Sequence, residues 1–174
     1  SDKTKVNALV KLNSFKVKIG YPDKWKDYSG VVVDKKLSYW ENVKAANLFR
    51  AKDSYSKWGK PVDKEEWGMT PQTVNAYYNP TTNEICFPAG ILQAPYFDVN
   101  ADDACNYGAI GVVIGHEMTH GFDDQGRNFD QNGNMIDWWT EEDATKFKQL
   151  TDKLVEQFNE IVVADDVHAN GRFT

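Results

Sequence analysis

The segment from Ala109 to Gly115 is the longest strongly apolar run in the chain, and it leads directly into His116-Glu117-Met118-Thr119-His120. Residues four apart lie on the same face of an α-helix, so a helix here points both imidazoles to one side. So apolar a run is not typical of an exposed helix, and it indicates that this helix is buried. We therefore expect a buried helix from about Ala104 to Phe122, with the two histidines in its last turns.

The pattern H-E-x-x-H has the spacing of a zinc site. Zinc binds imidazole nitrogens at about 2.0–2.1 Å, and the helical pitch lets His116 and His120 reach one ion. Glu117 can take a proton from a zinc-bound water, because zinc lowers the pKa of that water to about 7. The alternative is a pair of structural histidines in the core. Two of the chain's 3 histidines fall in this one pattern, which favours the metal.

The residues alone leave the third ligand open. The longer metzincin pattern is excluded, because Asp123 and Gly126 stand where it needs a glycine and a further ligand. Glu141 and Glu142 are candidates for a ligand from a second helix, but acidic residues there also suit a helix N-terminus. Asp123 and Asp124 are candidates for a hydrogen bond to the ring nitrogen of a histidine ligand that does not bind the metal. The alternative is that both aspartates lie at a solvated helix end.

Composition limits the other classes of function. The chain has 174 residues, and its net charge of −6 argues against nucleic acid or an anionic membrane as the main partner. No apolar run approaches the roughly 20 residues of a membrane helix, and Ser1–Lys5 contains no secretion signal. Cys86 and Cys105 favour free thiols, with a single disulfide between them as the alternative. The absence of an unblocked Asn-x-Ser/Thr acceptor favours a prokaryotic protein.

The remaining patterns predict an α+β fold that is mainly helical. Residues 1–72 are expected to form a lead-in of helices and loops, and residues 73–174 a strand edge, the H-E-x-x-H helix, a hairpin and a C-terminal helix. Three glycines inside the expected helix, at positions 108, 111 and 115, predict close packing against a neighbouring element. The expected elements are a helical face at Val6, Leu9 and Val10, a loop at Ile19–Asp23, a helix at Leu37–Tyr55, strands at Thr73–Tyr78 and Glu84–Phe87, a hairpin turn at Asn132-Gly133, and a last helix opened by Thr140 with Asp143 in the capping-box position.

Five segments in this order carry more specific motifs. They are Val74–Tyr78, Phe87–Gln93, Asn106–Gly108, Val113–Asp123 and Asp137–Thr140. Together they resemble successive signatures of the neprilysin and endothelin-converting-enzyme family of zinc endopeptidases, and the resemblance extends over most of the chain. It implies the core part of a thermolysin-like (gluzincin) zincin catalytic domain.

The resemblance also implies roles for individual residues. His116 and His120 would bind one Zn²⁺ ion, and Glu117 would be the general base. Asn75 and Ala76 would hold the substrate backbone, a role that an exposed strand edge can serve because it pairs with extended peptides.

The family's third zinc ligand is the glutamate of a G-E-N-x-x-D motif that follows an N-G-x-x-T-like segment. That segment corresponds here to Asn170–Thr174, the last residues of the chain. We therefore expect a truncated part of a zinc metalloendopeptidase, with an incomplete zinc site and little or no activity by itself. Its expected partners are peptide substrates and the remainder of the parent peptidase.

The resemblance favours an extracytoplasmic location, whether periplasmic, secreted or at the cell surface. Two other functions are left open by the sequence: a non-catalytic peptide-binding segment, and a structural module with two core histidines. Bound zinc would distinguish the peptidase from the structural module.

Overall fold

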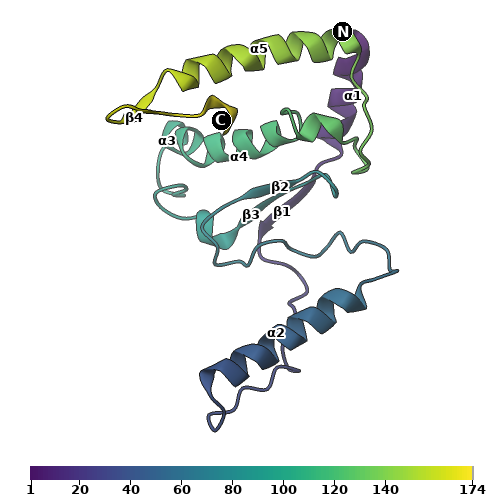
Figure 1. Cartoon of the computed structure of the whole chain (residues 1–174), viewed down its shortest axis with the longest axis vertical. Coiled ribbons are helices and arrows are strands. Elements are labelled where there is room, and N and C mark those ends of the chain that lie inside the picture. The colour runs from purple at the N-terminus through teal and green to yellow at the C-terminus, as the bar shows by residue number, and fades with distance from the viewer. Residues whose placement is uncertain (174) are drawn as a thin grey trace.

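The computed structural model describes residues 1–173 (Figure 1). Its helices are α1 (Asp2–Asn13), α2 (Tyr39–Ser56), α3 (Asp103–Gly108), α4 (Ile110–His120) and α5 (Glu141–Asn159), with 3₁₀ turns at Ala89–Ile91, Gly126–Asn128 and Gly171–Phe173. Its strands are β1 (Lys16–Gly20), β2 (Tyr77–Asn79), β3 (Glu84–Pro88), β4 (Val162–Ala164) and β5 (Val167–His168). Figure 1 shows α4 over one face of the β1–β3 sheet, α5 beyond α4, and α2 extending away from the other side of the sheet. This arrangement confirms the expected mainly helical α+β fold.

The central sheet has the strand order β1-β3-β2. Strand β3 pairs parallel with β1 and antiparallel with β2, and all of its residues are buried. The prediction of a loop at Ile19–Asp23 was wrong for its first two residues, because β1 extends to Gly20 and Ile19 pairs with Phe87. The alternation of lysine and apolar residues in β1 concealed the strand, since the Lys18 side chain is buried against Glu84 rather than solvated. The expected strand at Thr73–Tyr78 is also shorter, beginning only at Tyr77.

The core lies between α4 and the sheet. Its buried apolar residues come from the position before β2, from β3, from the turn that follows β3 and from the start of α4, and they are Ala76, Ile85, Phe87, Ile91 and Ile110. The single helix expected over residues 104–122 is two helices, because the backbone breaks at Ala109 with φ −108° and ψ −91°. The Ile110 amide instead donates to the Tyr96 carbonyl oxygen at 2.9 Å, which begins α4 against the sheet.

The expected close packing of the helix glycines is wrong within the described residues. A Cβ atom at Gly108 or Gly115 would meet nothing within 4 Å, and one at Gly111 would meet only the preceding helix. Gly108 is the last residue of α3. Gly115 lies on an exposed surface of α4.

Helices α1 and α5 meet at their N-termini. The Asp143 carboxylate accepts hydrogen bonds from the hydroxyls of Ser1, Thr4 and Thr140, and Thr140 caps α5 as expected. The expected apolar face of α1 is not buried, however. Its residues Val6, Leu9 and Val10 are 60%, 57% and 47% exposed, whereas Thr4 and Lys11 point inward.

Helix α2 stands apart from the sheet and buries none of its residues. Its start confirms the expected helix within two residues, since Ser38 and Glu41 form a reciprocal capping box. The connector after α2 returns to the sheet through Glu65 and Glu66. Lys16 bonds to the Glu65 carboxylate, and the Lys18 ammonium donates to the Glu66 carbonyl oxygen at 2.6 Å.

Two smaller expectations can be compared directly. The hairpin at Asn132-Gly133 is reduced to one bridge between Phe129 and Met135, with Gly133 at φ +85°. Both cysteines are free, Cys86 buried and Cys105 exposed. No helix among residues 1–173 is long and apolar enough to cross a bilayer.

Candidate metal centre

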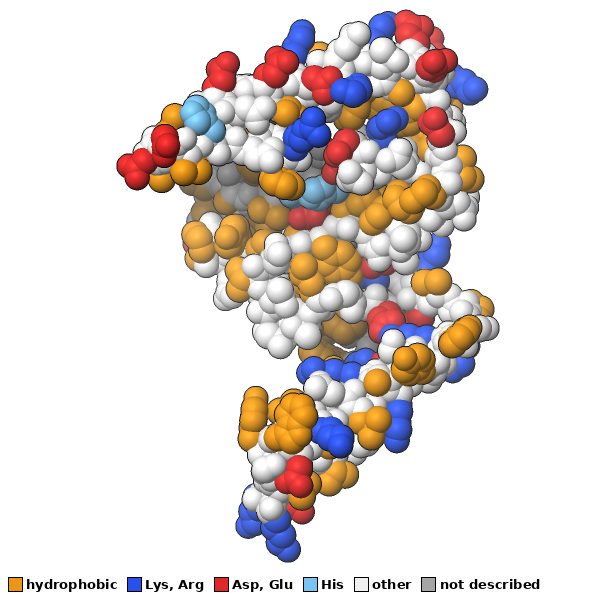
Figure 2. Space-filling model, in the orientation of Figure 1, with side chains coloured by type: hydrophobic (Ala, Val, Ile, Leu, Met, Phe, Trp, Pro, Cys, Tyr) orange, Lys and Arg blue, Asp and Glu red, His pale blue; other side chains and the backbone are white. Residues whose placement is uncertain are grey.

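The last turn of α4 brings two imidazoles together. His116 and His120 have their ring centroids 4.5 Å apart at an interplanar angle of 82°, and their Nε2 atoms are separated by 3.0 Å. The sequence produces this arrangement because residues four apart in a helix lie one turn above each other. In Figure 2 a histidine surface lies in the hollow between the upper helices and the sheet, bordered by acidic side chains.

The histidine pair fits a zinc ion. A tetrahedral zinc with nitrogen ligands at 2.0–2.1 Å separates two of them by about 3.3 Å, close to the observed Nε2–Nε2 distance. Within residues 1–173 no third His, Cys, Asp or Glu side chain joins these two. Glu141 and Glu142 lie instead in the first turn of α5, where the Lys146 ammonium pairs with Glu142. The structure thus supports the helix-start interpretation of these two glutamates.

Glu117 lies beside the histidines but on the sheet-facing side of α4. Its side chain is buried, with the residue only 6% exposed. Burial raises the pKa of this carboxyl, while the neighbouring His120 and His116 and the backbone amide of Tyr78 oppose the shift. A carboxylate in an apolar setting accepts a proton more readily than one in water, which is the property that a general base needs.

Asp123 orients one of the two histidines. Its Oδ2 atom accepts a hydrogen bond from Nδ1 of His120 at 2.7 Å. Its Oδ1 atom accepts from the amides of Gly126 at 2.7 Å and Gln125 at 3.0 Å. Because a carboxylate only accepts, Nδ1 of His120 carries the proton and Nε2 keeps its lone pair for a metal. Of the two aspartates that sequence reasoning considered, the structure selects Asp123 over Asp124.

A tight turn after α4 makes this contact possible. A Cβ atom on Gly126 would lie 1.7 Å from the His120 carbonyl oxygen, so only glycine allows the chain to fold back onto the helix end. In the sequence, Gly126 served only to exclude the metzincin pattern. A glycine at this position could also have indicated a close approach between backbone segments, because glycine has no Cβ atom.

The two expected substrate-binding residues directly precede β2. Asn75 is exposed, and its Oδ1 atom accepts a hydrogen bond from the Ala76 amide at 2.9 Å. Ala76 is 5% exposed and belongs to the core. Strand β2 is an edge of the sheet, since only β3 pairs with it among the described residues. Asn75 is therefore exposed next to the edge strand β2, which also contacts α4.

Lys11 is a functional candidate that sequence reasoning missed. Its ammonium donates to the carbonyl oxygens of Gly121 at 2.6 Å, Gly126 at 2.7 Å and Phe129 at 2.7 Å. The residue is 1% exposed, and burial lowers its pKa to about 8 against the opposing charges of nearby aspartates. The sequence around Lys11 does not predict these hydrogen bonds, because the acceptors are more than 100 positions away along the chain.

An H-E-x-x-H helix packed over a sheet with an antiparallel edge strand defines a zincin-type segment. The chain belongs to peptidase family M13, whose model matches residues 75–174. It is 49% identical over 156 residues to a putative zinc metalloproteinase of Streptococcus gordonii, covering 89% of this chain and 28% of that protein. It is 45% identical to an endothelin-converting enzyme homolog of Locusta migratoria, covering 98% of this chain and 24% of that protein.

A solved structure has the same fold. The chain superposes with a TM-score of 0.94 on the zinc metalloprotease ZMP1 of Mycobacterium tuberculosis, at 49% identity over 99% of this chain and 27% of that one. The family resemblance and the fold class predicted from the sequence are thereby confirmed. The chain spans about a quarter of the length of these relatives.

Proposed function

We propose that this chain is part of a zinc-dependent endopeptidase that hydrolyses peptide bonds in extended peptides. The observation that carries the proposal is the convergence of Nε2 of His116 and Nε2 of His120 beside the buried Glu117. Zinc, when bound, would supply a polarised water and a Lewis acid for the scissile carbonyl. In this site Glu117 accepts the proton of the attacking water, and Asp123 holds His120 in the tautomer that leaves Nε2 unprotonated.

The edge that precedes β2 is the proposed substrate contact. An extended peptide can align with this edge and exchange main-chain hydrogen bonds with it. Asn75 adds a side-chain amide that both donates and accepts, and Ala76 is small enough to let the peptide backbone approach. The contact between β2 and α4 supports this placement, because a peptide held there would run beside the metal-facing turn of α4.

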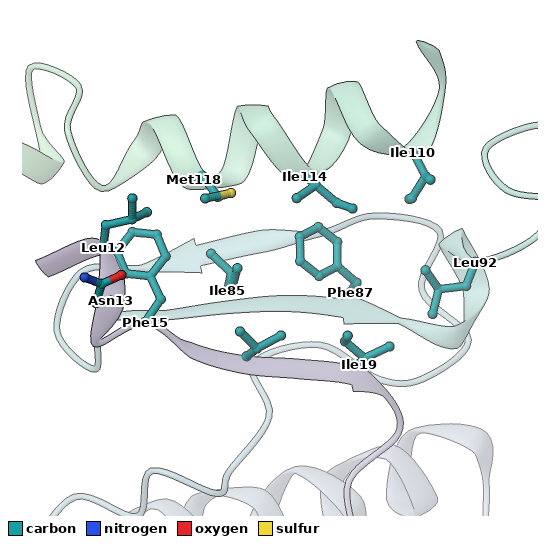
Figure 3. Close-up of a pocket in the computed structure, with 11 residues that line it drawn as sticks. Leu12, Asn13, Phe15, Ile19, Ile85, Phe87, Leu92, Ile110, Ile114 and Met118 are labelled. Carbon is teal, nitrogen blue, oxygen red and sulfur yellow. The ribbon is translucent and has the colours of Figure 1, made fainter. Parts of the chain in front are cut away.

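We further propose that the remainder of a longer peptidase completes the site with the third ligand. An apolar groove of about 620 Å³ opens between α4 and the sheet (Figure 3). Ile114 and Met118 line it from α4 and Phe87 from β3, while Val17 and Ile19 of β1 are 54% and 63% exposed. An apolar surface of this kind next to an unpaired strand edge is typical of a surface that another part of the protein covers.

The total exposed area supports the same proposal. A compact monomer of 19.8 kDa exposes about 8,600 Å², whereas this chain exposes 12,911 Å². The excess corresponds to surface that further sequence would bury. We also propose an extracytoplasmic parent protein on the basis of the family resemblance, and fractionation of the source cells would test this.

Metal analysis and peptide hydrolysis test the proposed function together. The full-length protein should contain one zinc ion per chain and cleave a quenched fluorescent peptide, with both properties abolished by a chelator. The double variant H116A/H120A should lose the ion. Equal zinc in the variant and the parent would contradict the metal site, and peptide binding that survives chelation without cleavage would identify a binding segment instead.

A further inference from the structure

Lys11 is connected to the metal-facing histidine by an unbroken series of hydrogen bonds. The ammonium donates to the Gly126 carbonyl oxygen, and the amide of Gly126 donates to Oδ1 of Asp123 at 2.7 Å. Oδ2 of the same carboxylate accepts from Nδ1 of His120 at 2.7 Å. Each step joins groups in direct contact, so a displacement of Lys11 is transmitted to the ring of His120.

The same ammonium also holds both ends of the segment that follows α4. It donates to the carbonyl oxygens of Gly121, directly after His120, and of Phe129, where the 3₁₀ turn ends. The three carbonyl oxygens accept all three protons of the ammonium, so Lys11 has no N–H left for another partner. The rings of Tyr78, Phe122 and Trp138 surround the charge, with centroids 5.8, 5.5 and 5.9 Å from Nζ.

Charge as well as geometry favours this arrangement. Asp123 is an anion facing a histidine that must remain neutral to bind a metal. The Lys11 cation interacts favourably with Asp123 and with Asp130, and so balances the carboxylate that His120 contacts. Without the Lys11 ammonium, residues 121–129 would lose the three hydrogen bonds that hold them, and the Asp123 carboxylate would lose its fixed orientation toward His120.

We propose that Lys11 is a positioning residue of the metal centre, which holds residues 121–129 so that Asp123 fixes the ring orientation and tautomer of His120. This inference rests on the proposed zinc function. The Lys11 ammonium bonds to three backbone carbonyl oxygens rather than to either histidine. Its role is to make His120 a preorganised ligand, although it lies on α1, 110 positions before Gly121 in the sequence.

A thermodynamic cycle of zinc affinity in the full-length protein tests the proposal. Zinc affinity is measured by competition with a chromophoric chelator for the parent, K11M, D123A and K11M/D123A. Loss of an orienting partner behind a histidine ligand costs about 10–100-fold in metal affinity, and we expect K11M to lose at least about 10-fold. Since Lys11 acts through Asp123, the double variant should bind zinc about as weakly as D123A alone.

Lys18 provides the matched control. It is also a buried lysine, 5% exposed, but it bonds to Glu84 and to the Glu66 carbonyl oxygen rather than to the segment after α4. K18M should therefore lower the melting temperature without changing zinc affinity. Unchanged zinc affinity in K11M, additive losses in the double variant, or an equal loss in K18M would each overturn the proposal.

A second measurement does not depend on zinc. In the metal-free protein, ¹⁵N chemical shifts of the His120 ring should report a proton on Nδ1 in the parent and in K18M, and a tautomer mixture in K11M. If K11M does not fold, K11Q, which keeps one side-chain amide donor, is measured in its place. A parent without bound zinc would refute the proposed function, whereas an unchanged His120 tautomer in the Lys11 variant would refute this inference alone.

Discussion

The burial of Glu117 beside the two histidines suits it to act as the general base of the site. Glu117 is next to His116 in sequence, yet its side chain points toward the sheet and is 6% exposed. Burial raises its pKa, and the two imidazoles limit that rise. Burial thus makes this carboxylate a better proton acceptor than one in water, which suits a general base. None of the other described acidic residues has both this burial and this proximity to the histidine pair.

Replacement of Glu117 by glutamine should separate binding from catalysis. The amide keeps the shape of the side chain but cannot accept the proton, so we expect peptide hydrolysis in the full-length protein to fall by about 10²–10⁴-fold. Zinc content should not change, because Glu117 is not a ligand in this arrangement. A quenched fluorescent peptide assay and metal analysis measure the two effects, and E142Q, on the exposed start of α5, is the control. Full activity of E117Q would remove Glu117 from the mechanism.

The ion pair between Lys18 and Glu84 is the second residue-scale feature with a clear consequence. Both side chains are buried, at 4% and 3% exposure, and their charged atoms are 2.8 Å apart. Removing one partner of such a pair leaves an uncompensated buried charge, which costs about 3–5 kcal/mol. We expect K18M to lose stability in this range in urea unfolding. The surface variant K148M, whose lysine pairs with Asp152, should change stability by less than about 1 kcal/mol.

At the scale of elements, the sequence predicted those features that depend on residues close together in the chain. The apolar spacing from Leu37 predicted the start of α2 within two residues, Thr140 predicted the start of α5, and the H-E-x-x-H spacing predicted the histidine pair. Strand β1 was missed because its burial depends on a parallel partner some 70 residues later. The break at Ala109 was missed because it depends on the Tyr96 carbonyl oxygen. The role of Lys11 was missed because it depends on contacts with residues more than 100 positions away in the sequence.

The turn after α4 gives a prediction at this scale. Gly126→Ala would place a methyl group 1.7 Å from the His120 carbonyl oxygen, so the turn must shift. We expect a loss of about 1–3 kcal/mol or more in unfolding free energy and weaker zinc binding. Gly115→Ala, within α4 itself, is the control, because a Cβ atom there meets nothing within 4 Å. In the 174-residue chain it should stabilise by about 0.5–1 kcal/mol, and a loss there would contradict the described surroundings of Gly115.

At the scale of the whole molecule, the exposed surface and the metal centre lead to one interpretation. The buried apolar core described for residues 1–173 consists of a few side chains between α4 and the sheet. Val17 and Ile19 of β1, the outer side of α4 and all of α2 remain accessible. The solved relative ZMP1, of which this chain matches 27%, has about three times as much further sequence with which such surfaces can be covered. The same further sequence is the proposed source of the third zinc ligand.

The 174-residue chain by itself should therefore be inactive and should expose apolar surface. A catalytic zinc needs three protein ligands and an open position, and residues 1–173 bring together only two. We expect no chelator-sensitive hydrolysis of a fluorescent peptide above the level of E117Q, together with strong binding of the dye ANS at the groove between α4 and β1. The full-length protein should hydrolyse the peptide and bind little dye. Val17→Lys in β1, 54% exposed here, should reduce dye binding by the short chain and destabilise the full-length protein. Turnover by the short chain that E117Q abolishes would mean that these residues already hold a complete site.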